Sequence, residues 1–248
     1  MKGWGAYSPP GPVTGGAVIE TEPDAPGMPV RVEALTDQTQ VTVSWTALAT
    51  GAPQGGPGVS VTSYELQWVA GATGGTWATH SGVSPLSLVT QRTASPVTAG
   101  SEYRFRVRAK NLHGWGPVSS ITYVKAATAP VQMLALTSAL DAATGGVKID
   151  FLAPYDSHET ITSYTIEIAY GVGPSWAEEL VSCDASSVTV MNNLHCIVPM
   201  STLTGAPFNL IYGEAVVARA RATNFYGDSP WSTPAGAVTI RTPPLQAN

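Results

Sequence analysis

The sequence predicts an all-β protein built from two tandem β-sandwich domains. Three observations support this prediction: the length of the chain, short stretches in which apolar and polar residues alternate, and an internal repeat. The chain has 248 residues, whereas a single domain usually has about 100–150. Its 25 Gly and 20 Pro indicate many turns, and a charged fraction of only 12% favours half-buried strands over salt-bridged surface helices.

The internal repeat defines the two domains. Residues 63–68 (SYELQW) are echoed one hundred positions later by residues 163–168 (SYTIEI). Further along the chain, residues 106–111 (RVRAKN) are echoed by residues 219–224 (RARATN). A repeat of this length indicates two copies of one folded unit. We therefore predict a first domain at 25–127 and a second, more divergent domain at 128–248.

The first residues of the chain fit the end of a third copy. Residues 3–8 (GWGAYS) align with residues 114–119 (GWGPVS) of the first domain. Residues 1–24 are therefore predicted to be the last strand of a preceding, truncated domain, followed by a linker. Such a strand either pairs with a sheet edge of another molecule or stays a frayed tail. We expect the frayed tail, so that deletion of residues 1–22 leaves stability and assembly unchanged.

Strands are predicted within both copies by strict alternation. Residues 41–45 (VTVSW), 103–108 (YRFRVR) and 147–151 (VKIDF) each place apolar side chains at every second position. This period of two directs one face of a strand to a core and the other to solvent. Short segments of this kind, separated by Gly, Pro, Ser and Asn, are typical of a β-sandwich, and no stretch with a helical period competes.

These residues resemble the fibronectin type III family over most of the chain. The first domain shows the family pattern at Pro26, Pro29, Trp45, Tyr64 and residues 103–111 (YRFRVRAKN). The second domain departs from it at two positions, because Phe151 replaces the Trp and Val216 stands where Tyr103 stood. The resemblance implies seven-stranded sandwiches that serve as spacers, adhesive modules or receptor ectodomains.

Charge and motifs argue against several classes of protein. The net charge of −5 and the pI near 5.3 give no basic field for nucleic acid. No apolar run approaches the roughly 20 residues of a membrane-spanning helix. Neither a nucleophile elbow, a zinc-protease motif nor a phosphate loop is present. We therefore predict no enzyme, no cofactor and no metal, and interpret Asp150, Asp156 and Glu159 as a solvated acidic turn.

The two cysteines of the chain, Cys183 and Cys196, are predicted to form a disulfide. They lie thirteen positions apart, and residues 187–191 between them resemble a strand. A disulfide would imply secretion. The alternative is a reduced pair in a cytosolic protein, because spacing alone does not exclude it. His195 is not expected to activate Cys196, since adjacent residues of a strand point to opposite faces.

Arginine and tryptophan residues are the candidates for an interaction surface. Arg104, Arg106 and Arg108 share one face of their strand. This stripe would either bind an anionic glycan or, as the family resemblance favours, cover the sheet and pack on aromatic rings. Trp115 and Trp231 follow the Gly turns of the two copies and would either anchor a partner or, as we prefer, cap the junction with the next domain.

The sequence thus predicts a non-catalytic structural, adhesive or assembly segment of a secreted or cell-surface protein. Its expected partners are neighbouring domains, a cell-surface protein, a glycan or further copies of the chain. Seven basic against four acidic residues in 25–127, and four against ten in 128–248, favour head-to-tail assembly into rods or filaments. Two alternatives remain: spacer modules of a secreted carbohydrate-active enzyme, and an intracellular scaffold array in which both thiols are free.

Overall fold

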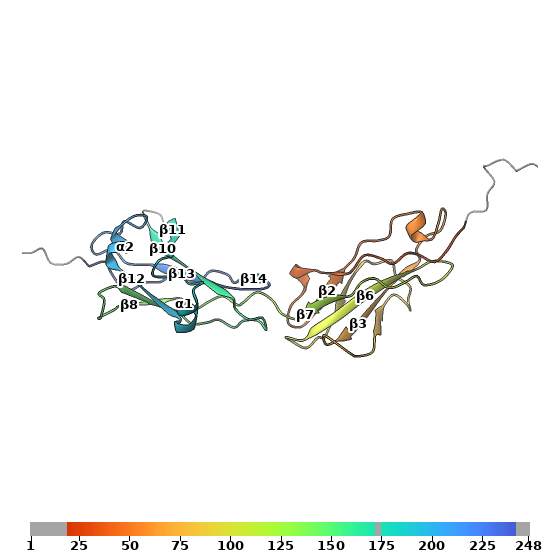
Figure 1. Cartoon of the computed structure of the whole chain (residues 1–248), viewed down its shortest axis with the longest axis horizontal. Coiled ribbons are helices and arrows are strands. Elements are labelled where there is room, and N and C mark those ends of the chain that lie inside the picture. Colours follow the sequence, from red (N-terminus) through yellow and green to blue (C-terminus); the bar gives the residue numbers. More distant parts are fainter. Residues whose placement is uncertain (1–18, 172–174, 242–248) are drawn as a thin grey trace, which may run out of the picture. The chain divides into compact units, whose positions relative to one another are not determined.

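The computed structural model describes residues 19–171 and 175–241, and Figure 1 shows their strands and helices. The chain divides into two compact units. The first comprises the described residues up to Leu35 together with Gln40–Pro96 and Ser101–Lys125. The second comprises the residues from Ala126 onward with two short loops, 36–39 and 97–100. Each unit contains two antiparallel sheets, as expected for an all-β chain.

The described residues of the first unit form seven strands. Its three-stranded sheet has the order β1 (Val30–Arg31), β2 (Val41–Ser44), β5 (Gln91–Ala94). Its four-stranded sheet has the order β4 (Ala78–Ser81), β3 (Ser63–Ala70), β6 (Glu102–Lys110), β7 (Thr122–Lys125). Two short 3-10 helices, η1 (Glu33–Leu35) and η2 (Ala52–Gln54), lie in the connections. The predicted seven-stranded β-sandwich is confirmed in this unit.

The core of the first unit is formed by the alternating residues that the sequence identifies. Val41 and Val43 of β2 are completely buried, as are Phe105 and Val107 of β6. Trp45 follows β2 and is also buried, with its ring centroid 6.2 Å from that of Tyr64 on the other sheet. Both sheets therefore contribute apolar side chains to one interior, which drives their association.

The second unit repeats this strand order. Its sheets are β12 (His195–Val198), β9 (Val147–Asp150), β8 (Thr137–Leu140) and β11 (Ser175–Glu178), β10 (Ser163–Tyr170), β13 (Ala218–Asn224), β14 (Gly227–Asp228). Phe151 occupies the place of Trp45 and lies 5.0 Å from Tyr164 between ring centroids. Val216, at the position of Tyr103, is fully enclosed in the core. Both departures from the family pattern are thus accommodated by apolar packing.

The second unit also contains two short helices that the sequence analysis did not predict. Helix α1 (Val188–Asn193) replaces the strand that we expected between the cysteines, and α2 (Met200–Thr204) follows β12. Ser187 caps α1 by accepting a hydrogen bond from the backbone of Val190, and Val190 alone is buried while Val188 is 73% exposed. The cap and the single buried side chain override the β-branched residues, whose strand preference is weak outside a sheet.

The segment that leads into the first unit is not frayed over its described residues. The backbone nitrogen of Thr21 donates to the carbonyl oxygen of Gly55 at 2.8 Å, and that of Asp24 donates to Pro53 at 2.9 Å. Glu20 lies 3.2 Å from the imidazole of His113. The expectation of a frayed tail up to residue 22 is therefore wrong for residues 20–22. Most of the predicted last strand of a preceding domain, which was expected from residue 3 to about residue 22, lies outside the described residues.

Candidate interaction surface

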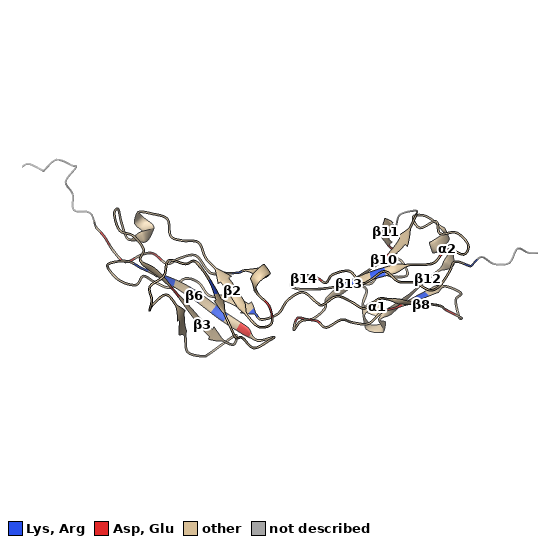
Figure 2. Cartoon of the chain, turned by 180° about the vertical axis from the view of Figure 1, so that it is seen from behind, with Lys and Arg blue, Asp and Glu red and all other residues tan. Residues whose placement is uncertain are grey.

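Strand β6 carries the arginine stripe on its outer face. Phe105 and Val107 point into the core, whereas Arg106 and Arg108 are half-buried on the opposite face. Figure 2 shows basic residues in blue on β6, and on β13 in the second unit. Apolar residues of β6 thus face the core and arginines face outward, in the alternation that the sequence predicts.

The basic residues of β6 contact two tryptophan rings. The guanidinium carbon of Arg106 lies 4.2 Å from the ring centroid of Trp77. That of Arg108 lies 4.9 Å from the ring centroid of Trp115, which the ammonium group of Lys110 approaches to 5.5 Å. At these distances a cation is attracted by the negative face of the ring. Trp115 therefore packs against the sheet of its own unit.

Arg104 differs from its two neighbours because it is only 8% exposed. Its Nε donates to the carbonyl oxygen of Gly71 at 2.8 Å, and its Nη2 donates to the carbonyl oxygen of Gly74. These bonds close the turn between β3 and β4. Arg104 therefore serves the fold of the turn, and its guanidinium carbon also lies 5.6 Å from the ring centroid of Trp77.

Glu65 is a buried carboxylate beneath the stripe, with 1% of its surface exposed. It accepts hydrogen bonds from the Thr79 hydroxyl, from the Gln67 amide at 3.1 Å and from Nε of Arg108. Burial alone would raise the pKa of Glu65, but the bonds from Thr79, Gln67 and Arg108 together outweigh it and lower the pKa. Sequence reasoning missed this group, because a single Glu in an alternating strand resembles a solvent-facing residue.

The second unit contains the same arrangement with fewer members. The guanidinium carbon of Arg219 lies 4.2 Å from the ring centroid of Trp176 and 4.3 Å from that of Trp231. Arg219 also forms an ion pair with Glu167 at 2.6 Å. Arg221 lies 4.7 Å from the Trp231 ring and pairs with Asp228 at 2.8 Å. We call these two sets of stacked residues, one on each unit, the arginine–tryptophan faces.

The arginine–tryptophan faces agree with the packing interpretation of the stripe. Trp115 and Trp231, singled out in the sequence, each lie under basic side chains of their own unit. The other two tryptophans of these faces, Trp77 and Trp176, were not identified as site residues; they contact Arg106 and Arg219. The signal was present, since these two tryptophans recur at nearly the same offset as the rest of the repeat.

A disulfide links Cys183 to Cys196, as predicted, with a Cα–Cα distance of 5.0 Å. Both residues are buried. Cys196 lies on β12, and Cys183 lies in a loop organised by the buried carboxylate of Glu179. This carboxylate accepts hydrogen bonds from three successive backbone nitrogens, those of Val181, Ser182 and Cys183, at 2.7–3.1 Å. The bridge therefore fastens a preorganised loop to the three-stranded sheet.

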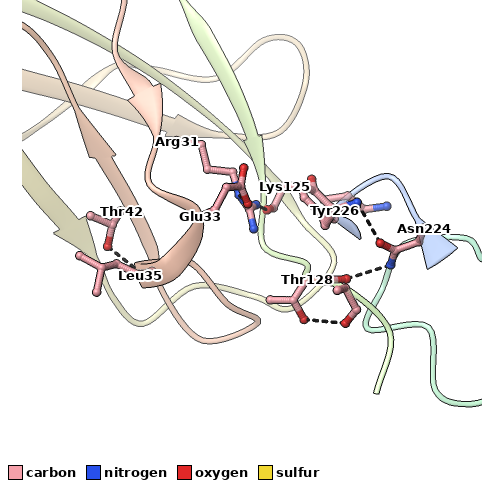
Figure 3. A network of polar contacts seen from close by, with 9 residues as sticks. Arg31, Glu33, Leu35, Thr42, Lys125, Thr128, Asn224 and Tyr226 are labelled. Carbon is pink, nitrogen blue, oxygen red and sulfur yellow. Dashed lines mark hydrogen bonds and ion pairs between the residues drawn. The ribbon is translucent and has the colours of Figure 1, made fainter. Parts of the chain in front are cut away.

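An asparagine at the end of β13 joins three segments of the second unit. Nδ2 of Asn224 donates to the carbonyl oxygen of Thr128 at 2.8 Å (Figure 3). It also donates to the carbonyl oxygen of Asp156 at 3.1 Å. Its Oδ1 accepts from the backbone of Tyr226 at 2.8 Å. We call this group the Asn224 clamp. Asn224 stands at the same position of the repeat as Asn111, and this recurrence indicates a shared role for the two residues. The sequence does not indicate which carbonyl groups the amide would reach.

Within residues 19–171 and 175–241, no cluster of three or more His, Cys, Asp or Glu side chains is arranged to hold a metal ion. Asp150, part of the predicted acidic turn, forms an ion pair with Lys148 at 2.6 Å. In the same described ranges, no helix is both long enough and apolar enough to span a bilayer.

Comparison with known proteins supports the resemblance seen in the sequence. Residues 24–125 match the fibronectin type III domain family. Protein sidekick-1 of Gallus gallus is 27% identical over 227 residues, which is 88% of this chain and 9% of that protein. The chain thus spans about a tenth of the length of this curated relative.

Two solved structures of similar proteins were also found. The FN1–FN3 domains of chicken CNTN1 are 14% identical, with coverage of 90% of this chain and 69% of that chain and a TM-score of 0.46. The twitchin kinase region from C. elegans is 28% identical over 42% of this chain and 17% of that chain, with a TM-score of 0.34.

Proposed function

We propose that this chain is a non-catalytic structural or adhesive segment of a larger secreted or cell-surface protein, with domains at 25–127 and 128–248. The observation that carries the proposal is the buried disulfide between Cys183 and Cys196 in a sandwich of this family's type. Disulfides persist in oxidising compartments and are rare in the cytosol. The bridge therefore favours a secreted segment over an intracellular scaffold.

The arginine–tryptophan faces support a structural role for the two domains. Their guanidinium groups stack on rings or pair with carboxylates of the same unit, as Arg219 does with Trp176 and Glu167. Side chains engaged in this way stiffen a sheet and cover its apolar surface. Because these groups are already occupied, we do not carry forward the anionic glycan as a partner. We propose that the partners of this segment are proteins, including further copies of the chain.

The mass of the natively produced protein tests this proposal. After alkylation without reduction the mass should be unchanged, and reduction followed by alkylation should add two alkyl groups, at Cys183 and Cys196. Two alkyl groups added before any reduction would contradict the secreted assignment and favour the intracellular scaffold.

Assembly of copies is the second part of the proposal. The excess of basic residues in 25–127 and of acidic residues in 128–248 favours contacts between unlike domains of neighbouring molecules. Light scattering should show particles larger than a monomer at low salt that dissociate as salt screens these charges. A monomer at every salt concentration would refute self-assembly and leave a segment that only spaces or binds other proteins.

A further inference from the structure

The second unit has an aromatic groove beside the place where its described residues end. The groove has a volume of about 540 Å³ and is lined by Tyr170, Pro207, Phe208, Ile211, Tyr212 and Glu214. Phe208 forms its buried floor and meets Tyr170 edge to face at 6.3 Å between ring centroids. Ile211 and Tyr212 are 71% and 72% exposed. Two adjacent large apolar side chains are therefore left open to a ligand.

The wall formed by Ile211 and Tyr212 is preformed. The backbone nitrogen of Ile211 donates to the Glu214 carboxylate, and the nitrogen of Glu214 donates back to the carbonyl oxygen of Ile211, both at 3.0 Å. Gly213 completes this turn with a φ of 83°, a value that a glycine adopts without strain. A ligand would therefore bind without ordering the turn first, which lowers the entropic cost of binding.

The last described residues run along this wall. The nitrogen of Gly213 donates to the carbonyl oxygen of Ile240 at 3.0 Å, and the nitrogen of Ile240 donates to Glu214 at 2.8 Å. Arg241 and Tyr212 line one adjoining hollow, so Tyr212 is shared between that hollow and the aromatic groove. The described residues thus end at Arg241, in a hollow that shares Tyr212 with the aromatic groove.

The residues that follow have the chemistry for such a groove. Residues 242–245 are Thr, Pro, Pro and Leu, and residues 246–248 complete the sequence. Proline lacks a backbone donor and cannot extend a sheet, but extended proline segments bind grooves lined by aromatic rings. In that conformation four residues span about 12 Å.

We infer that the aromatic groove binds the segment 242–245 of the same chain, with proline rings against Tyr212 and Tyr170. This contact would fix the direction in which the chain leaves the second unit. Residues 8–13 (SPPGPV) also contain prolines, but they would have to come from the far end of the sequence or from another molecule. The local segment is favoured because its effective concentration at the groove is high.

Proton NMR of the full chain tests this inference. We expect nuclear Overhauser contacts between the Tyr212 ring and protons of Pro243 or Pro244, and a heteronuclear NOE at Leu245 clearly above that of Asn248. Tyr212→Ala should abolish the contacts and lower the Leu245 value to that of Asn248. Tyr155→Ala is the matched control, because Tyr155 is also an exposed tyrosine of the second unit, and it should change neither.

A second variant covers the case in which Tyr212→Ala disturbs the fold. Replacing Pro243 and Pro244 by Ser leaves the groove intact and should shift the amide signals of Ile211 and Gly213. The inference is wrong if Leu245 is as mobile as Asn248 in the unaltered chain, or if the Tyr212 contacts come from residues 8–13. Contacts that disappear on dilution would also refute it, because they would identify a second copy as the occupant.

Discussion

The side-chain amide of Asn111 donates a hydrogen bond of 2.6 Å to the carbonyl oxygen of Thr21, ninety residues earlier in the chain. Asn111 also donates to Gln54 at 2.9 Å, so one side chain ties the leading segment to a loop of the first unit. The Asn224 clamp makes the equivalent bond to Thr128. Each unit therefore includes, as part of its fold, a few residues that precede its first strand.

The Asn224 clamp predicts a clear cost for its removal. Asn224→Ala leaves the half-buried carbonyl groups of Thr128 and Asp156 without their amide donor, and the loss of these two hydrogen bonds should destabilise the second unit by about 1–3 kcal/mol. Urea denaturation followed by NMR signals of that unit would measure the loss. Asn192→Ala, at an exposed position of α1, is the control and should change stability by less than about 0.5 kcal/mol. Equal effects of both substitutions would contradict a clamp.

Truncation of the leading segment should be costly only when Thr21 is removed. Deletion of residues 1–22 eliminates the hydrogen bond from Thr21 to Gly55 and that from Asn111 to Thr21, and should lower the stability of the first unit by about 1–3 kcal/mol. Deletion of residues 1–18 retains both bonds and should have little effect. Thermal denaturation of the two truncated chains compares them directly. If both are as stable as the full chain, the leading segment does not belong to the fold.

The backbone of the leading segment passes so close to residue 116 that only glycine fits there. A Cβ atom on Gly116 would lie 2.0 Å from the carbonyl oxygen of Pro23, with no side chain able to move aside. Gly116→Ala should therefore displace the leading segment and weaken protection of the Thr21 amide in hydrogen exchange. Gly58→Ala is a poor match because its φ is positive, whereas Gly27→Ala meets no atom within 4 Å and serves as the control. Unchanged protection in Gly116→Ala would contradict this prediction.

The fold and the outward-facing residues of the strands could be predicted from the sequence, whereas most polar contacts between loops could not. Alternation places Phe105 inward and Arg106 outward because a strand has only two faces, so the pattern alone is sufficient. The hydrogen bonds of the Asn111 side chain depend on which loops meet at the end of a strand. The three amides bound by Glu179 depend on the path of one loop. Such tertiary contacts between distant or irregular segments leave no period in the sequence.

The buried carboxylate of Glu65 predicts an acid-dependent loss of stability in the first unit. Its pKa is lowered in the folded state, so its contribution is present above the ordinary pKa of a glutamate and is lost as the pH falls through the folded pKa. Stability measured between pH 7 and pH 3 should fall less steeply in Glu65→Gln than in the unaltered chain. Thr79→Val removes one hydrogen bond to the carboxylate and should give an intermediate slope. Identical slopes in all three proteins would refute the assignment.

The final prediction concerns Arg219, whose guanidinium lies between the rings of Trp176 and Trp231 and pairs with Glu167. Arg219→Ala removes two cation–π contacts and a half-buried ion pair, and should destabilise the second unit by about 1–3 kcal/mol. Arg219→Lys keeps the charge but loses the planar group that stacks on both rings, so it should recover only part of this loss. Denaturation of the two variants, monitored by NMR signals of the second unit, measures the difference. Full recovery by Lys would show that the ion pair, and not stacking, stabilises this face.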